Sequence, residues 1–300
     1  MAADTGEDRS KRRGGWVPFG LLAPGSIWLT LFFLVPLLTL LRTALSEKRS
    51  RFDPNLDLTW RFATFGDALS QFSNQFIRSF LYAGAASLLC VAIGYPMAYF
   101  IATRGGRYRN VLLGLVVVPF FTSFLIRTLA WQTVLNDRGP ILTLIRNLHL
   151  DGVLSSLHVI QHDRLLSTNV AVVGGLTYNF LPFMILPIYV SLEKIDFRLL
   201  DAAKDLYANG WQAFRKVVLP LSLPGVFAGT LLTFIPAAGD FVNAQFLGSP
   251  NQSMIGSVVQ DRFLRQLDYP TAAALSFILM AIITTAVLIY ARLLGTDDLV

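Results

Sequence analysis

Long apolar runs alternate with shorter polar stretches along the whole chain. A helix needs about 20 apolar residues to cross the hydrocarbon core of a bilayer. Helices are expected in such runs because every backbone donor inside lipid needs a partner within its own segment. Six runs are long enough, so we predict an all-α polytopic membrane protein with six transmembrane helices. The predicted spans cover residues 19–41, 80–102, 111–135, 169–191, 221–239 and 271–293.

The composition also indicates a membrane protein. Hydrophobic residues make up 54% of the 300 residues and charged residues 15%, whereas an ordinary soluble domain has about 25% charged residues. One soluble core cannot bury that much apolar surface, so a lone soluble domain, a disordered chain and a fibrous protein are excluded. The single cysteine, Cys90, cannot form a disulfide within the chain.

The first apolar run follows Lys11, Arg12 and Arg13, so a signal peptide is an alternative to a span. The run is too long for the apolar region of a signal peptide, and no small-x-small cleavage site ends it. We interpret it as a retained span. The chain then divides into an N-terminal tail, residues 1–18, and a transmembrane domain, residues 19–300.

Lys and Arg are distributed unevenly among the segments that connect the spans. They are denser in residues 1–18, 103–110 and 192–220 than in the connections on the opposite side. Because basic residues are retained on the cytoplasmic side of a membrane, we predict that both termini and the segment 192–220 are cytoplasmic. The same rule accounts for the net charge of +6 without a nucleic-acid partner.

Sequence signatures of catalysis are missing from the chain. It has no GxxxxGK[ST] phosphate-binding loop, no HExxH, no GxSxG and no CxxC, so we predict neither an enzyme nor a nucleotide-binding protein. His158 and His162 have the i, i+4 spacing that could hold a metal ion on a helix. No cysteine and no clear acidic partner joins them, so we predict no metal site.

The segment 192–220 has the pattern of two short helices joined by a turn. Leu and Ala favour a first helix over about residues 198–207. Asn209 and Gly210 both tolerate a positive φ and are predicted to form the turn. A second helix, residues 211–218, is expected to stop before Pro220 because proline lacks a backbone N–H.

This segment resembles the cytoplasmic signature of permease subunits of type I ABC importers, which is E-A-A, three residues, G, nine residues, I-x-L-P. Asp201-Ala202-Ala203 takes the first position and residues 217–220 take the last, with the same spacing. Tyr207 stands where the family has glycine. If that glycine has a positive φ, Tyr207 is strained, and the turn is expected to shift to Asn209-Gly210. An ordinary amphipathic connector between two spans is the alternative interpretation.

The resemblance implies that the segment is a coupling helix seated in a groove of a separate ATPase subunit. It also implies a second permease subunit, two ATPase (nucleotide-binding) subunits and an extracytoplasmic solute-binding protein as partners. This chain then binds no cofactor itself, and ATP and Mg are used by the ATPase subunits, whose closure switches access to a central cavity. The residues implied in ATPase coupling are Asp201, Ala202, Ala203, Tyr207, Asn209, Gly210, Leu219 and Pro220.

Three further stretches are similar to the first permease subunit of bacterial spermidine/putrescine importers. They cover residues 119–131, 178–189 and 234–241. This resemblance implies a polyamine substrate and a place in the bacterial cytoplasmic (inner) membrane. The first alternative is the same architecture carrying a sugar, an opine or an oxyanion. The second is a six-span membrane enzyme or receptor.

A polyamine carries several ammonium groups, so its path should offer carboxylates, carbonyls and aromatic faces. Polar residues within spans are expected to line a cavity or to be paired. Arg127 and Asp240 are predicted at similar depth near the outer mouth, where they could pair, but Arg127 could instead reach the interface. The aromatic residues could simply pack. The candidate pathway residues are Asp240, Tyr178, Asn179, Phe180, Trp131 and Arg127.

Overall fold

The computed structural model describes residues 17–48, 56–148, 164–196, 198–205 and 207–293. Most of the predicted N-terminal tail, and both His158 and His162, lie outside these residues. The described chain is almost entirely helical apart from one short β-hairpin, so the all-α prediction is confirmed. Five helices are long and apolar enough to cross a membrane, and the number is six if one bent pair counts as a single span.

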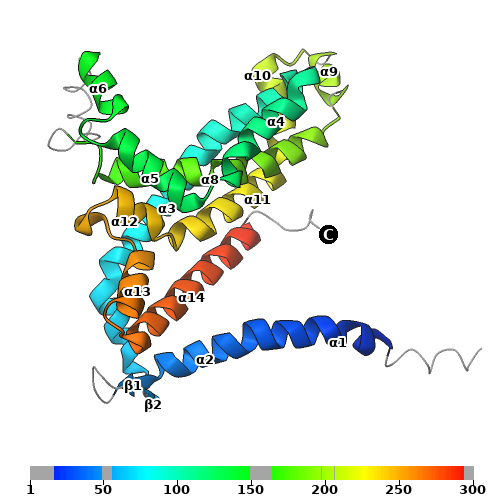
Figure 1. Ribbon diagram of the computed structural model, residues 1–300. Helices are drawn as coiled ribbons and strands as arrows, with labels where there is room; N and C mark the ends of the chain where they lie inside the picture. Colours follow the sequence, from blue (N-terminus) through cyan, green and yellow to red (C-terminus); the bar gives the residue numbers. More distant parts are fainter. Residues whose placement is uncertain (1–16, 49–55, 149–163, 197, 206, 294–300) are drawn as a thin grey trace, which may run out of the picture.

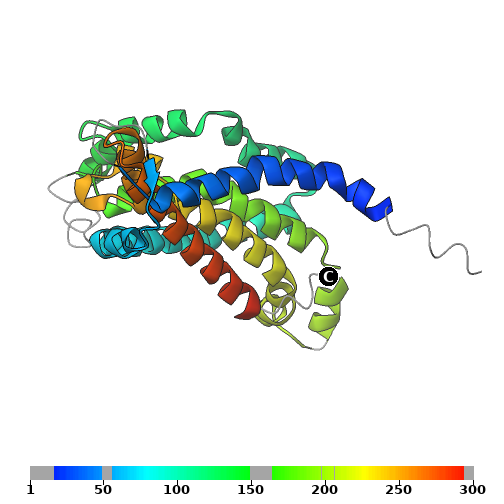
Figure 2. The ribbon, with the colours of Figure 1, turned by 90° about the horizontal axis from the view of Figure 1, so that it is seen from below.

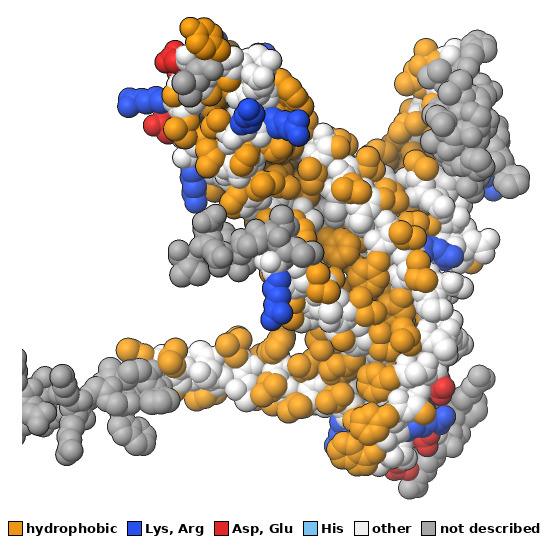
Figure 3. Space-filling model, turned by 180° about the vertical axis from the view of Figure 1, so that it is seen from behind, with side chains coloured by type: hydrophobic (Ala, Val, Ile, Leu, Met, Phe, Trp, Pro, Cys, Tyr) orange, Lys and Arg blue, Asp and Glu red, His pale blue; other side chains and the backbone are white. Residues whose placement is uncertain are grey.

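The described helices run between two ends of the molecule (Figures 1 and 2). One end carries the start of α1 (Val17–Leu29), the end of α14 (Tyr269–Leu293), α9 (Arg198–Asp205) and α10 (Gly210–Ala213). The opposite end carries the hairpin, α6 (Pro140–Asn147) and α12 (Val242–Leu247). On the face shown in Figure 3, hydrophobic side chains cover most of the surface between these ends.

The first span is a single rod that projects away from the other helices (Figure 1). Here α1 continues through a π turn, η1 (Thr30–Leu34), into α2 (Val35–Ala44). Most side chains from Leu21 to Arg42 are exposed. A helix that is apolar all round needs lipid or another protein around it. The span, Leu21–Ala44, agrees closely with the predicted residues 19–41.

The second span is much longer than predicted. A hairpin of β1 (Ser46–Lys48) and β2 (Leu56–Leu58) is followed directly by α3, which covers Ala63–Arg104 and is kinked at Phe72. The helix therefore begins at Ala63, well before residue 80, where the second span is predicted to start. Helical spacing explains the extension, because Ala68, Phe72 and Phe76 lie on one buried face that packs with α14.

The third predicted span, residues 111–135, is broken rather than straight. After η2 (Gly106–Tyr108), the chain forms α4 (Arg109–Val117), η3 (Val118–Phe121) and α5 (Phe124–Leu135). The two limbs are bent by 93°, and the second continues to Asn147. Pro119 lacks an N–H, and Thr122 and Ser123 have extended ψ values of 149° and 136°.

Two helices, α8 (Asn169–Glu193) and α11 (Leu219–Ala238), form the centre of the bundle together with α3. Glycine lets α8 and α11 approach closely. A Cβ placed on Gly225 of α11 would lie 2.6 Å from the carbonyl oxygen of Pro187 and 2.9 Å from Cα of Ile188. Gly229, one turn later, faces Met184 in the same way. This is the small-xxx-small packing that replaces the hydrophobic effect inside lipid.

Pro220 does not end a helix, contrary to prediction. The chain runs without a break from α10 through a π turn, η4 (Phe214–Val218), into α11, so the fifth span covers Gly210–Ala238. The N–H of Leu219 bonds to the carbonyl of Phe214, five residues earlier. This wider turn accommodates a proline whose ring would otherwise clash with the carbonyl four residues before it.

The last part of the chain returns across the bundle. After α12 come η5 (Pro250–Gln252), α13 (Ile255–Leu264) and α14. A buried serine on α3 anchors the start of α13, since the N–H of Ile255 donates to Ser79 Oγ over 2.7 Å. The sixth span, Tyr269–Arg292, agrees with the predicted residues 271–293.

We predict that Gly225→Ala destabilises the bundle. The added methyl meets backbone atoms of α8 that cannot rotate away, and such overpacking costs about 1–3 kcal/mol. The apparent unfolding temperature in detergent should therefore fall by several degrees. Gly174→Ala on α8 is the matched control, because a Cβ there meets nothing within 4 Å. Equal unfolding temperatures for the two variants would contradict the close crossing.

Candidate functional site

The predicted coupling segment forms α9 and α10 at the tip of one arm of the molecule (Figure 1). Asp201 and Ala202 of α9 are exposed and Ala203 is half-buried. The helix ends at Asp205, two residues before the predicted end. Leu219 and Pro220 lie at the other end of the motif, in the first turn of α11.

Tyr207, at the family's glycine position, has a positive φ of 60°. A left-handed backbone costs a residue with a Cβ about 1–2 kcal/mol, so the expected strain is present. Its side chain is 98% exposed. Among the described residues of this loop, Tyr207 therefore combines the strained backbone with the most exposed large side chain.

The predicted shift of the turn to Asn209 and Gly210 is wrong. Asn209 has a φ of −70° and Gly210 is already the first residue of α10. The reason is a reciprocal cap, in which Asn209 Oδ1 accepts from the N–H of Gln212 over 2.8 Å and Gln212 Oε1 accepts from the N–H of Asn209 over 3.0 Å. This capping box fixes Asn209 in an extended conformation.

A cluster of aromatic side chains packs the end of the coupling segment against α3. The ring of Phe214 lies edge-on to Tyr95 and Tyr99 at centroid distances of 5.7 and 5.6 Å, and it stacks on Trp211 at 5.6 Å. The Tyr95 hydroxyl bonds to Ser222 Oγ of α11 over 2.7 Å. Sequence reasoning missed this cluster, although the i, i+3 spacing of Trp211 and Phe214 was a visible signal.

A second site, which we call the polar cluster, consists of Thr128, Asn179, Asp240 and Asn243. All four are buried. The amide of Asn179 on α8 donates to Asn243 Oδ1 on α12 over 3.0 Å and to Thr128 Oγ1 on α5 over 3.3 Å. Asp240, between α11 and α12, accepts from the N–H of Asn243 over 2.7 Å. The cluster thus joins three helices and the connection between α11 and α12 through polar contacts.

The polar cluster is not fully satisfied. Asn179 Oδ1 and Asn243 Nδ2 are buried without a hydrogen-bond partner in the described part of the chain. Asp240 is only 7% exposed, and no ion pair to it occurs among the described residues. Donors on Asn243 and Ala244 compensate part of the cost of burying this carboxylate, but no cation does so among the described residues. The arrangement therefore has spare capacity for a ligand with cationic or donor groups.

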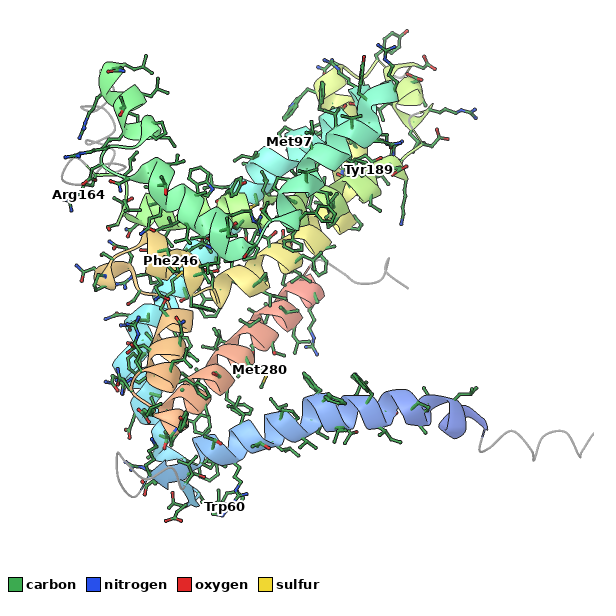
Figure 4. All side chains as sticks on the ribbon, in the orientation of Figure 1. Trp60, Met97, Arg164, Tyr189, Phe246 and Met280 are labelled. Atoms are coloured by element: carbon green, nitrogen blue, oxygen red, sulfur yellow. The ribbon has the colours of Figure 1, made fainter. Side chains whose placement is uncertain are left out.

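Two glycines make room for this cluster. A Cβ on Gly175 would lie 2.8 Å from Asn243 Oδ1, and one on Gly256 of α13 would lie 3.0 Å from the carbonyl oxygen of Asp240. The residues flanking Asp240, Gly239 and Phe241, line an open hollow of about 800 Å³ between α11, α13 and α14. Met280 of α14, labelled in Figure 4, belongs to the same wall.

Arg127 and Asp240 do not pair in the described structure. The Arg127 guanidinium lies over the rings of Phe120 and Phe124, at 4.9 and 5.7 Å from their centroids. Its Nε is buried without a partner among the described residues. Arg127 lines a largely apolar hollow of about 510 Å³ between α3, α4 and α8, together with Tyr178. Cation–π contacts therefore take the place of the ion pair.

The remaining aromatic candidates differ in environment. Tyr178 is 37% exposed and meets Trp131 edge-on at 5.3 Å. Phe180 is buried and packs against Phe124 and Phe183. The structure therefore brings Asn179 and Asp240 together, places Arg127 with Tyr178, and leaves Phe180 in the core. Sequence reasoning missed Thr128 and Asn243, although each is a polar residue within or beside an apolar stretch.

Comparison with known proteins identifies close relatives of the chain. Residues 91–295 match the family described as binding-protein-dependent transport system inner membrane component. The spermidine/putrescine transport system permease protein PotB of Haemophilus influenzae is 35% identical over 273 residues, which are 88% of this chain and 90% of that protein.

Two solved structures share the fold. One is a bacterial ABC transporter involved in the import of the acidic polysaccharide alginate, with a TM-score of 0.63 and 19% identity over 93% of this chain and 95% of that one. The other is the bacterial alginate ABC transporter in complex with an alginate pentasaccharide-bound periplasmic protein. Its TM-score is 0.61, with 19% identity over 92% and 93% of the two chains.

We predict that Asn179→Leu destabilises the protein by about 1–2 kcal/mol, because it removes two interhelical hydrogen bonds and leaves their acceptors buried. The apparent unfolding temperature in detergent should fall measurably. Asn147→Leu, at the exposed end of α6, is the control and should leave it unchanged. A stabilising Asn179→Leu would mean that the polar cluster does not hold these helices together.

Proposed function

Since the chain belongs to the family of binding-protein-dependent transport system inner membrane components, we propose that it is the membrane subunit of an ATP-driven importer of spermidine or putrescine. The observation that carries the substrate is the 35% identity to a spermidine/putrescine permease along nearly the full length of both chains. Two permeases that shared only the fold would not need to be similar in sequence along their whole length.

The buried carboxylate of Asp240 supports this substrate. An ammonium group of a polyamine would supply the missing positive charge, and the unpaired Asn179 Oδ1 would accept a further hydrogen bond from it. Tyr178 and Trp131, which contact each other, would offer aromatic faces to the substrate in the hollow that Arg127 also lines, and each cation–π contact contributes about 0.5–2 kcal/mol. Binding of this kind is strongest in a site that excludes water.

We infer that transport is driven through α9 and α10. The proposed partners are a second permease subunit, two ATPase subunits that use ATP and Mg, and an extracytoplasmic solute-binding protein. The chain itself would bind no cofactor and would not hydrolyse ATP. Closure of the ATPase subunits would switch the cavity between outward and inward access, provided that the loop makes different contacts in the two states.

The arrangement of the helices supports the orientation we propose. Both ends of the described chain lie at the same end of the molecule as α9 and α10 (Figure 1). If the ATPase subunits dock on α9 and α10, this end is cytoplasmic. The end that carries the hairpin, α6 and α12 would then face the solute-binding protein.

One observation favours a second candidate, an importer of an anionic solute such as an oxyanion. Arg127 presents a buried, unpartnered Nε beside a hollow, and a guanidinium there would suit an anion. A cationic substrate would depend on Asp240 and an anionic substrate on Arg127, so variants at these two residues distinguish the candidates.

We predict that Asp240→Asn lowers spermidine uptake about tenfold or more at low substrate concentration. A hydrogen bond to a charged group contributes about 1.5–3 kcal/mol, and 1.4 kcal/mol corresponds to a factor of ten. Uptake is measured in proteoliposomes that contain the complete complex. Asp67→Asn, on an exposed part of α3, is the control.

Arg127→Gln should change polyamine uptake independently of Asp240→Asn, because no ion pair joins the two residues in the described structure. The double variant is then expected to show the product of the two single effects. Saturable, ATP-dependent uptake of an oxyanion or a sugar without polyamine uptake would overturn the proposed substrate.

We predict that Tyr207→Gly relieves backbone strain but weakens coupling. Glycine adopts a positive φ freely, so the unfolding temperature should stay the same or rise slightly. If the exposed ring contacts the ATPase subunit, the variant should bind that subunit several-fold more weakly, and Tyr207→Phe should bind it normally. Unchanged binding by Tyr207→Gly would remove Tyr207 from the coupling surface.

A further inference from the structure

The side chain of Arg109, the first residue of α4, contacts the end of α8. It donates a hydrogen bond to the hydroxyl of Tyr189, forms an ion pair with the carboxylate of Glu193, and lies over the Tyr189 ring at 4.9 Å. Tyr189 belongs to the arm that carries α9 and α10 (Figure 4). The start of the broken span is thus tied to the last turn of α8.

The end of α8 is in turn tied to the loop. Glu193 is its last residue, and α9 begins five residues later at Arg198. Ile195 in this short connection is buried and belongs to the same hydrophobic cluster as Leu192 and Val218. Because Ile195 is packed in this cluster only three residues before α9 begins, a displacement of α9 is expected to reach Glu193.

The first limb of the broken span is loosely packed apart from this contact. Every residue of α4 is exposed or half-buried. Its partly buried side chains, Leu112, Leu113 and Val116, lie against the cluster of α3 and α8. The limb leads through η3 to Phe120, whose ring lies beneath Arg127. A displacement of Arg109 would therefore move α4, the limb of the broken span that leads to the bend.

The chemistry of these contacts suits a reversible connection. The side chains of Arg109 and Glu193 are 33% and 49% exposed, and exposed ion pairs contribute little to stability. The planar guanidinium can nevertheless hold a carboxylate, a phenol and an aromatic face together, which an ammonium group cannot. The contact is weak enough to break and re-form during a transport cycle. It is also specific enough to fix the position of α4 relative to the end of α8.

We propose that Arg109 is a positioning residue that transmits movement of the coupling loop to the broken third span. This inference rests on the proposed function of α9 and α10 in ATPase coupling. When the loop moves, Glu193 and Tyr189 carry Arg109 with them, and the angle between α4 and α5 changes.

The test uses the complete complex in proteoliposomes and measures the number of solute molecules taken up per ATP hydrolysed. Arg109→Met should lower this ratio about tenfold while ATP hydrolysis stays within twofold of the wild type and the unfolding temperature is unchanged. Arg109→Lys should have an intermediate ratio. Arg107→Met is the matched control, because the side chain of Arg107 bonds to its neighbour Tyr108, and it should couple normally.

Reversal of the ion pair tests the connection directly. Glu193→Arg alone should be uncoupled, and the double variant Arg109→Glu with Glu193→Arg should recover at least half of the wild-type ratio. The inference is overturned if Arg109→Met couples like Arg107→Met, or if its loss accompanies a lower unfolding temperature and is not rescued by the reversal. A wild-type complex that carries another solute would refute only the substrate, since the same ratio is read with that solute.

Discussion

Inside a membrane, a backbone N–H or C=O group without a partner costs several kcal/mol, and this constraint decides where the helices of the protein can depart from regular geometry. The described chain departs from it at the bend between η3 and α5. There Thr122 donates to the carbonyl of Pro119 twice, from its backbone N–H over 3.2 Å and from its Oγ1 over 2.6 Å. Local side-chain and backbone bonds thus replace part of the helical ladder at the bend.

The same constraint explains how two of the prolines within the spans are accommodated. Both described π turns lie directly before a proline, since η1 ends two residues before Pro36 and η4 ends two residues before Pro220. In each turn, the residue before the proline bonds to a carbonyl five residues back. The wider turn moves the carbonyl that would clash with the proline ring, so the helix continues. Proline bends these two spans less than it bends the chain after Pro119.

Much of the fold could be predicted from the number of consecutive apolar residues, because the thickness of the bilayer fixes that number. The predictions failed where a particular side-chain contact overrides the local preference of the chain. Residues 63–79 look polar enough for a loop, but their buried face packs with α14. Asn209 and Gly210 fit a turn locally, but the cap formed with Gln212 prevails. The spacing of the motif in the loop is a local property, and it did predict the strain at Tyr207.

The site residues were harder to predict for the same reason. Asn179 and Asp240 were recognisable because a polar group at depth is costly and needs a partner. Thr128 and Asn243 are polar residues within or beside apolar stretches, but the sequence does not show that both bond to Asn179 on α8. Arg127 and Asp240 have similar predicted depth, but depth along the membrane does not fix the direction of a side chain around its helix. Arg127 instead meets the rings of Phe120 and Phe124.

The polar contacts that α8 makes with α4 and α5 affect the angle between these two limbs of the broken span. α5 is held to α8 through Thr128 and Asn179, and α4 is held to α8 through Arg109, so α8 carries a polar attachment to each limb. The bend between them is packed far less, and Phe121 at its apex is 86% exposed. On either side of this apex, Phe120 packs edge-on against Phe183 and Phe124 packs against Phe180, both on α8. The two polar attachments and these ring contacts together set the angle at which the span rests.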